Sequence, residues 1–192
     1  MLYIYYSKIN ENLNINIDDF PQVVKDHLLK KKNEKTYQVS KHSWYILDTL
    51  LKKYFKKNLD EINVSFTKNG KPISEDIYFS ISHSNRIVCI AISDNNVGID
   101  IECLKPIDNL EKLVYTLFKE LPFNSNDLLL NFYLAYTSYE AYIKYNNLTL
   151  GYPKNKLYLR DDCVSNIIEV ENEKYVLSYL SNEIAKIKEI IV

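Results

Sequence analysis

The stretch that decides the fold runs from Ile77 to Glu102 and reads IYFSISHSNRIVCIAISDNNVGIDIE. Its β-branched and aromatic residues gather in three segments, Ile77–His83, Ile87–Ser93 and Val97–Glu102, a composition typical of strands. Short segments rich in asparagine and serine, which favour turns, separate the three. The stretch therefore predicts three consecutive strands, the first two of which form a hairpin.

Strand and helix patterns also flank this stretch on both sides. Apolar residues at helical spacing predict helices at 21–32, 41–56, 109–121 and 127–145. Further strands are expected at 2–6, 157–159, 165–171 and 174–180, with a last one within 184–192. This order of elements is typical of an α+β protein with antiparallel sheets. We expect two similar halves that meet near residue 100.

The composition is that of an ordinary globular protein. With 46% hydrophobic and 26% charged residues, the chain can bury a core and does not resemble a disordered segment. A formal net charge of −1 argues against a general nucleic-acid-binding protein, which needs an excess of basic residues to neutralise phosphates. Lysines cluster at 30–32 and between 52 and 57, and these runs fit solvated helix faces. A small lysine-rich nucleic-acid-binding module is the alternative that they leave open.

The cysteines and the apolar runs indicate the compartment. Cys89, Cys103 and Cys163 are scattered and odd in number, which fits a reducing environment better than a disulfide framework. They also lack the paired spacing of a zinc site. The N-terminus shows no signal-peptide pattern, and no apolar run reaches the roughly 18 residues that a membrane helix needs. We expect a cytoplasmic protein without a membrane partner.

Two carboxylates on the third strand are candidates for metal binding. Asp100 and Glu102 lie two residues apart, so their side chains share one face of the strand. Two carboxylates so placed repel each other unless a cation lies between them, and paired hard oxygen ligands suit Mg²⁺ bound to substrate phosphates. The simpler alternative is an exposed strand face with two solvated acids.

Two further groups of polar residues are candidates for binding a phosphate. The string SISHS at Ser80–Ser84 brings hydroxyls and His83 to the end of a strand, where a phosphate can bind. The alternative there is a turn capped by its serines. Glu140 and Lys144 are four residues apart on a predicted helix, a spacing that fits either a surface ion pair or two charges beside a phosphate. Neither group decides the function by itself.

Four strings taken together resemble a known family. They are GKP at 70–72, FSISHS at 79–84, VGIDIE at 97–102 and FYxxYTxxEAxxK at 132–144. In order and approximate spacing they are similar to the motifs of the 4′-phosphopantetheinyl transferases of the larger, monomeric Sfp type. Gly70 and Gly98, two of only three glycines in the chain, also fall at glycine positions of that family.

The resemblance implies an enzyme, a holo-acyl-carrier-protein synthase or 4′-phosphopantetheinyl transferase. Such an enzyme transfers 4′-phosphopantetheine from coenzyme A to a serine of an apo acyl or peptidyl carrier protein and releases adenosine 3′,5′-bisphosphate. The resemblance further implies Mg²⁺, with Mn²⁺ as an alternative, and a monomer. It also implies a fold of two similar α+β halves, each an antiparallel sheet packed on helices, with the active site in the cleft between them. Coenzyme A and the carrier protein are the implied partners.

The resemblance also assigns roles to residues of this sequence. Asp100, Glu102 and Glu140 hold the metal, Glu140 or a water that it holds accepts the serine proton, and Lys144 contacts a phosphate. Ser82 and His83 lie against the phosphates of coenzyme A, Lys71 lies near its adenine, and Lys31 or Lys41 binds its 3′-phosphate. The half 1–100 then contacts the coenzyme, and the half 101–192 carries the metal site and the catalytic helix.

The sequence departs from the family pattern on the last helix. The family has tryptophan and lysine where this chain has Tyr136 and Tyr139, and the missing lysine removes a cation beside Glu140. We expect weaker coenzyme binding, and we expect Tyr139→Lys to leave activity unchanged or to raise it. The alternative function is that of a degenerate homologue, catalytically weak or inactive, that serves as a coenzyme A-binding or carrier-protein-interacting module. We also expect Asp100 at an exposed sheet edge or cleft, so that Asp100→Ala leaves the fold intact.

Overall fold

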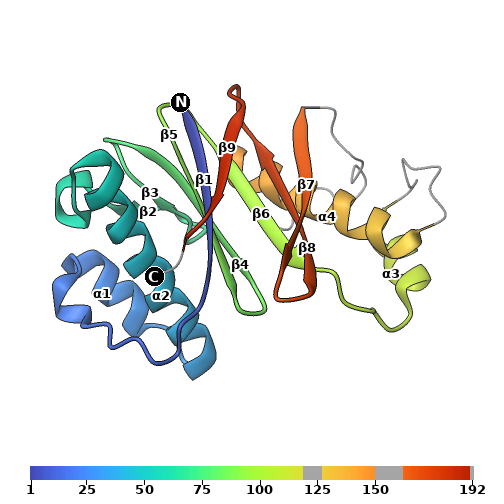
Figure 1. Ribbon diagram of the computed structural model, residues 1–192, viewed down its shortest axis with the longest axis horizontal. Coiled ribbons are helices and arrows are strands. Elements are labelled where there is room, and N and C mark those ends of the chain that lie inside the picture. The colour runs from blue at the N-terminus through green and yellow to red at the C-terminus, as the bar shows by residue number, and fades with distance from the viewer. Residues whose placement is uncertain (119–126, 150–161, 191–192) are drawn as a thin grey trace.

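Two main sheets, each covered by helices on its outer side, make up the described part of the chain (Figure 1). The computed structural model describes residues 1–118, 127–149 and 162–190. The strands are β1 (Leu2–Lys8), β2 (Ser65–Phe66), β3 (Pro72–Ile73), β4 (Tyr78–Ser84), β5 (Ile87–Ser93), β6 (Gly98–Cys103), β7 (Cys163–Val170), β8 (Glu173–Leu180) and β9 (Ala185–Glu189). The helices are α1 (Gln22–Leu29), α2 (Glu34–Leu50), α3 (Leu110–Leu117) and α4 (Leu128–Asn146), with short helical turns at Ile17–Asp19, Leu51–Phe55 and Leu59–Ile62.

The sheets confirm the predicted α+β class. The first sheet has the strand order β4-β5-β1-β9 and the second has the order β6-β8-β7, while β2 and β3 form a small separate ribbon. The three strands expected within 77–102 are present: β5 spans the expected residues, and β4 and β6 each begin and end one residue later. The expected strand at 157–159 and the last residues of the expected helix 109–121 lie outside the described residues.

An apolar core between the two sheets holds the halves together. Leu2 and Ile4 of β1 and Cys89 and Ala91 of β5 pack there against alternate residues of β6 and β8. The opposite face of the first sheet packs on α1 and α2, which explains why every residue of β5 is buried. A strand covered on both faces reads as a continuous apolar run, and IVCIAIS is such a run.

The second helix begins earlier than the apolar spacing predicts. Asn33 caps it by accepting a hydrogen bond from the backbone N–H of Thr36, so α2 starts at Glu34 and not at Lys41. The helix ends in one π-helical turn, after which Lys56 adopts a left-handed conformation at φ 56°. The cap and the irregular end together shift the predicted boundaries.

The second half packs α3 and α4 on the outer face of β8. Phe132, Tyr139 and Ile143 of α4 form an apolar cluster with Val114 of α3 and Val176 of β8. Strands β7 and β8 pair antiparallel, and β8 pairs with β6 in the same way. Helix α4 therefore lies across the sheet that contains β6 (Figure 1).

The end of the chain returns to the first sheet. Strand β9, which lies within the last strand expected from the sequence, pairs parallel with β1 so that Leu2 lies opposite Ala185. This pairing places a strand from the C-terminal part of the sequence in the sheet of the N-terminal half. Strand β6, in turn, belongs to the second sheet, although it starts at residue 98.

Gly98 marks the closest approach between β6 and α4. A Cβ atom at this position would lie 2.0 Å from the backbone oxygen of Ala141 and 2.6 Å from the backbone nitrogen of Tyr145. Only a residue without a side chain allows the strand and the helix to meet backbone to backbone here. The glycine therefore sets the distance between two elements that carry predicted site residues.

A search of the described helices for a membrane span gave a negative result. None of them combines the length and the apolar character required to cross a bilayer.

Candidate active site

Strand β6 lies between β4 and α4, and it presents two of the predicted acids to them. Asp100 and Glu102 lie on the side of the strand opposite Ile99 and Ile101, which pack in the core between the sheets. The acids are therefore held at the junction of the two halves.

Three serines of β4 cover the free edge of β6. The backbone N–H groups of Ile99, Ile101 and Cys103 donate hydrogen bonds to the hydroxyl oxygens of Ser80, Ser82 and Ser84, at 3.2, 3.4 and 3.0 Å respectively. The hydroxyls of Ser82 and Ser84 donate in turn to Asp100 Oδ1 and Glu102 Oε2, both at 2.7 Å. We call this contact between β4 and β6 the serine seam.

Asp100 is buried at the centre of the site. Only 5% of the residue is exposed, so the expectation of an exposed position at a sheet edge is wrong: β6 is an edge strand, but β4 and α4 cover it. Lys144 Nζ lies 2.8 Å from Asp100 Oδ1, which also accepts the bond from Ser82. The other oxygen, Oδ2, is buried and has no hydrogen-bond partner within the described residues.

Glu140 of α4 has a strongly raised pKa. Its burial and the nearby charge of Asp100 raise the pKa of Glu140 to about 7, because both disfavour the ionised carboxylate. Its Oε1 atom is buried and finds no hydrogen-bond partner in the parts of the chain that the structure describes. The surface ion pair with Lys144 that the spacing suggested is absent among the described ion pairs, since Lys144 bonds to Asp100.

Glu102 is the third acid of the cluster and interacts electrostatically with Asp100 and Glu140. Burial raises the pKa of Glu102, and the hydrogen bond from Ser84 opposes that rise. The charges of Asp100 and Glu102 both act on Glu140. The donor chemistry fits a hard divalent cation, because carboxylate oxygens are its preferred ligands and two of these oxygens are buried without a partner among the described residues. Within the described residues, however, no three His, Cys, Asp or Glu side chains gather closely enough to form a recognisable metal site.

A pocket of about 510 Å³ opens beside these acids, and we call it the inter-half pocket. Its lining comes from the turn before β3, from β4 and from the C-terminal part of α4: Asn69, Gly70, Lys71, Pro72, Ser80, Ile81, Glu140, Ile143, Lys144, Asn147, Leu148 and Thr149. Burial and the charge of Lys144 lower the pKa of Lys71 to about 8. The pocket thus combines one carboxylate with two lysines.

Side chains of the first half cap the C-terminal end of α4. Lys71 Nζ donates to the backbone oxygen of Lys144, Asn96 donates to that of Tyr145 at 2.8 Å, and Asn69 donates to that of Asn147 at 3.2 Å. The last carbonyl groups of a helix have no partner within the helix and carry partial negative charge, so these donors stabilise the helix end. The first half therefore helps to fix the helix that carries Glu140 and Lys144.

The predicted phosphate-binding pair, Ser82 and His83, points to opposite faces of β4. Ser82 is buried in the serine seam, whereas His83 is exposed on the other face. Partial desolvation and the charge of Lys144 lower the pKa of His83, and Lys31 is near enough to lower it slightly further. The joint binding of a phosphate by His83 and Lys31 stays a prediction.

Lys41 lies elsewhere in the first half. Its ammonium group is 5.6 Å from the centre of the Tyr37 ring, and it lines a separate pocket of about 830 Å³ together with His42 and Arg86. No described contact joins it to the inter-half pocket.

Comparison with known proteins identifies the family. The chain is 33% identical over 138 residues to the 4′-phosphopantetheinyl transferase gsp of Aneurinibacillus migulanus, a match that covers 66% of this chain and 57% of that protein. The chain is related to the 4′-phosphopantetheinyl transferases over the matched region. Two further transferases of the same name match it: HetI of Nostoc sp., 29% identical over 52% of this chain and 47% of the relative, and Sfp of Bacillus subtilis, 28% identical over 60% and 54%.

The matches to the transferases are partial. The chain spans about half the length of the curated relatives that it matches. No family profile matches the chain. The resemblance to the superfamily and to its Sfp type is confirmed, while the roles of individual residues stay predictions.

The structure adds residues to the candidate site that the sequence did not assign. Ser80 and Ser84 join Ser82 in the serine seam, and Asn69 and Asn96 cap α4. The alternation S-x-S-x-S in β4 was the available signal for the serines, because it puts all three hydroxyls on one face. The asparagines gave no signal, since their role depends on the position of α4.

Tyr139, which replaces the usual lysine of the transferases, lies in the core of the second half. Only 7% of it is exposed, and it belongs to the apolar cluster of Phe132, Ile143 and Val176. In this chain Tyr139 therefore serves the packing of the core, and the effect of the missing lysine on coenzyme binding stays a prediction. Glu140 and Tyr139 are consecutive in the helix and point in different directions.

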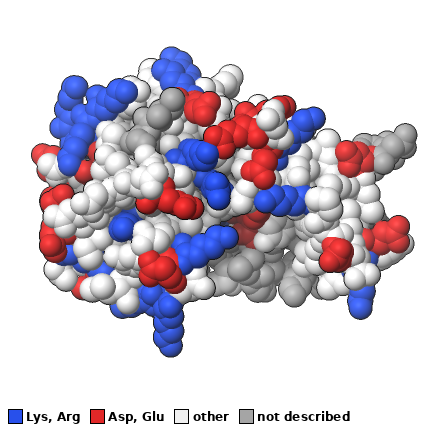
Figure 2. Space-filling view, turned by 60° about the horizontal axis from the view of Figure 1, so that its bottom comes forward, with Lys and Arg blue, Asp and Glu red and all other residues white. Residues whose placement is uncertain are grey.

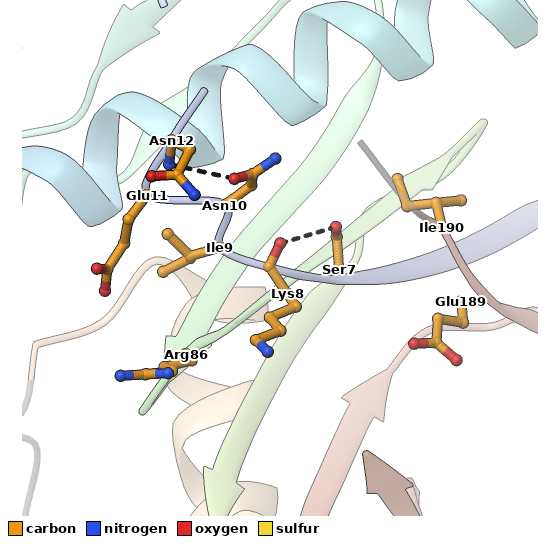
Figure 3. A pocket seen from close by; sticks show the side chains of 9 residues that line it. All are labelled: Ser7, Lys8, Ile9, Asn10, Glu11, Asn12, Arg86, Glu189 and Ile190. Atoms are coloured by element: carbon orange, nitrogen blue, oxygen red, sulfur yellow. Dashed lines mark hydrogen bonds between the residues drawn. The ribbon is translucent and has the colours of Figure 1, made fainter. Parts of the chain in front are cut away.

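A second charged pocket lies in the first half of this transferase homologue, and we call it the β9 pocket. It has a volume of about 340 Å³ and is lined by Ser7, Lys8, Ile9, Asn10, Glu11, Asn12, Arg86, Glu189 and Ile190 (Figure 3). None of the predicted site residues lines it. Its four charged residues are all exposed, and the only bonds drawn between its residues join Ser7 to Lys8 and Asn10 to Asn12.

Proposed function

We propose that the protein transfers 4′-phosphopantetheine from coenzyme A to a serine of an apo acyl or peptidyl carrier protein. The three relatives carry the name of this activity. The observation that carries the proposal is the cluster of Asp100, Glu102 and Glu140, in which two buried carboxylate oxygens have no partner among the described groups. Burying acids in this way costs free energy, and acids with strongly shifted pKa values cluster at functional sites.

The acids are proposed to hold Mg²⁺, with Mn²⁺ as a substitute. Asp100, Glu102 and Glu140 supply the carboxylate oxygens that such an ion prefers. Bound there, the ion would neutralise charge that builds up on the pyrophosphate of coenzyme A. Lys144 neutralises Asp100 in the structure, and it lines the inter-half pocket, where a pyrophosphate would meet it as a second cation.

The transfer itself needs a group that takes up one proton. The carrier serine attacks the β-phosphorus of coenzyme A, an O–P bond forms, the O–P bond to adenosine 3′,5′-bisphosphate breaks, and the serine proton must leave. Glu140, or a water that it holds, is the proposed acceptor, and its pKa of about 7 suits a general base near neutral pH. Glu140 also lines the inter-half pocket, so it is accessible to such a substrate.

The coenzyme is proposed to extend from the inter-half pocket along the β4 edge. Lys71 in the pocket would lie near the adenine, and His83 with Lys31 would bind the 3′-phosphate. Lys41 is the weaker candidate, because it lines a different pocket. Since Ser82 is occupied in the serine seam, His83 is the member of the pair that can contact a phosphate directly.

All the proposed groups come from one chain, which supports a monomer as the working unit. The three cysteines, all within the described residues, form no disulfide, which is compatible with the proposed cytoplasmic location. Basic and acidic side chains alternate over the face in Figure 2, so the described residues give that face no broad basic surface for a nucleic acid. A carrier protein and coenzyme A are the proposed partners.

The experiment that tests the proposal measures the intact mass of several apo carrier proteins after incubation with the protein, coenzyme A and Mg²⁺. The expected result is a mass gain of one phosphopantetheine arm, which disappears in EDTA and with Glu140→Gln. Glu189→Gln is the matched control, because it removes an exposed carboxylate in the β9 pocket. If no carrier gains mass while coenzyme A still binds, the protein is a degenerate homologue and the proposal fails.

A further inference from the structure

The serine seam supplies hydrogen-bond acceptors to backbone N–H groups at the edge of β6. Among the described strands of the second sheet, β6 pairs with β8 alone, so the N–H groups of Ile99, Ile101 and Cys103 face outward with no partner in a described strand. Buried N–H groups of this kind must find acceptors. The hydroxyl oxygens of β4 accept all three, each from the residue nineteen positions later in the chain.

This role leaves each hydroxyl with a proton to donate. A serine hydroxyl has one donor and can accept two bonds, and here the backbone N–H of β6 fills an acceptor position. Asp100 directly precedes Ile101, whose N–H donates to Ser82, and Glu102 directly precedes Cys103, whose N–H donates to Ser84. Ser82 and Ser84 donate to one oxygen of each acid at 2.7 Å, a length typical of a strong bond to a carboxylate.

The bonds fix which oxygen of each acid remains available. Asp100 Oδ1 takes both Ser82 and Lys144, while Oδ2 is left without a partner in the described structure. Glu102 is held through Oε2 by Ser84. A carboxylate with one oxygen anchored has lost most of its rotational freedom, and its second oxygen has a defined position.

We propose that Ser82 and Ser84 are positioning residues, which hold Asp100 and Glu102 in the orientation that binds the divalent cation. The inference rests on the proposed function, because it takes these acids as the ligands. It gives Ser82 a different role from a direct contact to the phosphates of coenzyme A. Groups that orient metal ligands commonly contribute 10- to 100-fold to metal affinity.

The third serine supplies an internal control. Ser80 accepts the N–H of Ile99 at 3.2 Å as the other two serines accept theirs, but the residue beside that N–H is Gly98, which has no carboxylate. Ser80→Ala therefore removes a hydroxyl from the seam without releasing an acid. Ser84→Ala removes the same kind of backbone contact and also releases Glu102.

The test compares full-length Ser80→Ala, Ser82→Ala, Ser84→Ala and Ser84→Thr with the wild type. Mn²⁺ binding is measured by electron paramagnetic resonance with and without coenzyme A, and the stability of each variant is measured by urea unfolding in EDTA. Without coenzyme A, we expect Mn²⁺ binding about 10-fold weaker than in the wild type for Ser82→Ala and Ser84→Ala, and within about 3-fold of the wild type for Ser84→Thr. Ser80→Ala should change this coenzyme-free affinity by less than about 2-fold; the comparison is made without coenzyme A because Ser80 lines the inter-half pocket. The losses of stability should be similar for Ser80→Ala and Ser84→Ala.

A double substitution separates orientation from a general loosening of the seam. In a Glu102→Gln background, Ser84→Ala should weaken Mn²⁺ binding no further, because the carboxylate that it orients is already gone. Equal weakening in Ser80→Ala and Ser84→Ala, or wild-type affinity in Ser84→Ala, overturns the inference.

The two proposals fail in different ways. If the wild type modifies carriers while Ser84→Ala keeps its Mn²⁺ affinity, only the positioning role fails. If no carrier is modified but the affinities follow the expected order, only the transfer reaction fails. A wild type that binds no Mn²⁺ even with coenzyme A overturns both.

Discussion

The inter-half pocket and the β9 pocket both gather acidic and basic side chains, but the charges of the two pockets differ in their exposure to water. In the β9 pocket Lys8, Arg86, Glu11 and Glu189 are all exposed, and Lys8 is paired outside the pocket with Glu171. Beside the inter-half pocket Asp100 is buried, and two carboxylate oxygens lack partners among the described atoms. Water can solvate the first set of charges but reaches the second set poorly.

This difference separates an ordinary charged surface from a candidate active site. Charges in water cost little and contribute little to stability, so a polar pocket on the surface needs no function to explain it. Buried acids that raise one another's pKa destabilise the fold, and they persist where a ligand or a reaction uses them. The following predictions test whether the two pockets differ in this way.

The largest effect is expected where the two halves of the site touch. In Gly98→Ala the new Cβ would meet backbone atoms of Ala141 and Tyr145, which cannot move without shifting α4. We expect a loss of about 3 kcal/mol or more in the free energy of unfolding, together with loss of transfer. Gly70→Ala is the matched control: φ is +77° there and nothing lies within 4 Å of the new Cβ, so about 1 kcal/mol of backbone strain is expected. Equal unfolding free energies of the two variants in urea would mean that β6 and α4 do not need their close contact.

The next effect concerns Tyr139, which the sequence places beside the predicted catalytic residue Glu140 and the structure places in the core. Tyr139→Lys puts an ammonium group at a position that is 7% exposed, among apolar side chains. We expect a loss of about 2 kcal/mol or more in unfolding free energy, and no gain in kcat at a temperature where the variant is folded. Tyr139→Phe serves as the control for the lost hydroxyl. A folded variant with raised activity would return this position to the active site.

Part of the fold and of the candidate site could be predicted from the sequence. The strands β4, β5 and β6 follow from local composition and alternation, and IVCIAIS is recognised because its residues are apolar on both faces. The residues Asp100, Glu102, Glu140 and Lys144 were found through the family strings, and the structure brings them together.

The remaining features depend on contacts between distant segments. Helical spacing alone could not show that Lys144 bonds to Asp100 and leaves Glu140, since both partners lie within reach of a long side chain. The parallel pairing of β9 with β1 likewise depends on where the chain returns, which no local pattern encodes. The burial of Asp100 follows from β4 and α4 covering the edge of β6, so an isolated strand pattern read it as exposed.

A pH-dependent effect should distinguish Glu140 from exposed acids. The pKa of Glu140 is about 7 in the folded protein against 4.5 as the reference value, so the folded state binds this proton more tightly than the unfolded state. Between pH 4.5 and 7 the metal-free protein should therefore lose stability as pH rises, and the full penalty should remain above pH 7. Glu140→Gln removes the penalty, and we expect it to raise the free energy of unfolding by about 1 kcal/mol at pH 8 and by much less at pH 4.5.

Urea unfolding in EDTA at the two pH values measures this difference, with Glu189→Gln as the exposed control. Addition of Mg²⁺ should stabilise the wild type at pH 8 and stabilise Glu140→Gln less. A difference between Glu140→Gln and the wild type that is the same at both pH values would show that the carboxylate does not titrate near 7.

The smallest effect is expected in the β9 pocket. Lys8 forms an ion pair with Glu171 at 2.6 Å, but the two side chains are 41% and 64% exposed. Exposed pairs of this kind contribute little, because water solvates both charges and two long side chains must be ordered to make the contact. Lys8→Met should change the free energy of unfolding by less than about 0.5 kcal/mol and leave transfer unchanged. A large loss of transfer in Lys8→Met, without a loss of stability, would make the β9 pocket part of the functional surface and would remove the contrast between the two pockets.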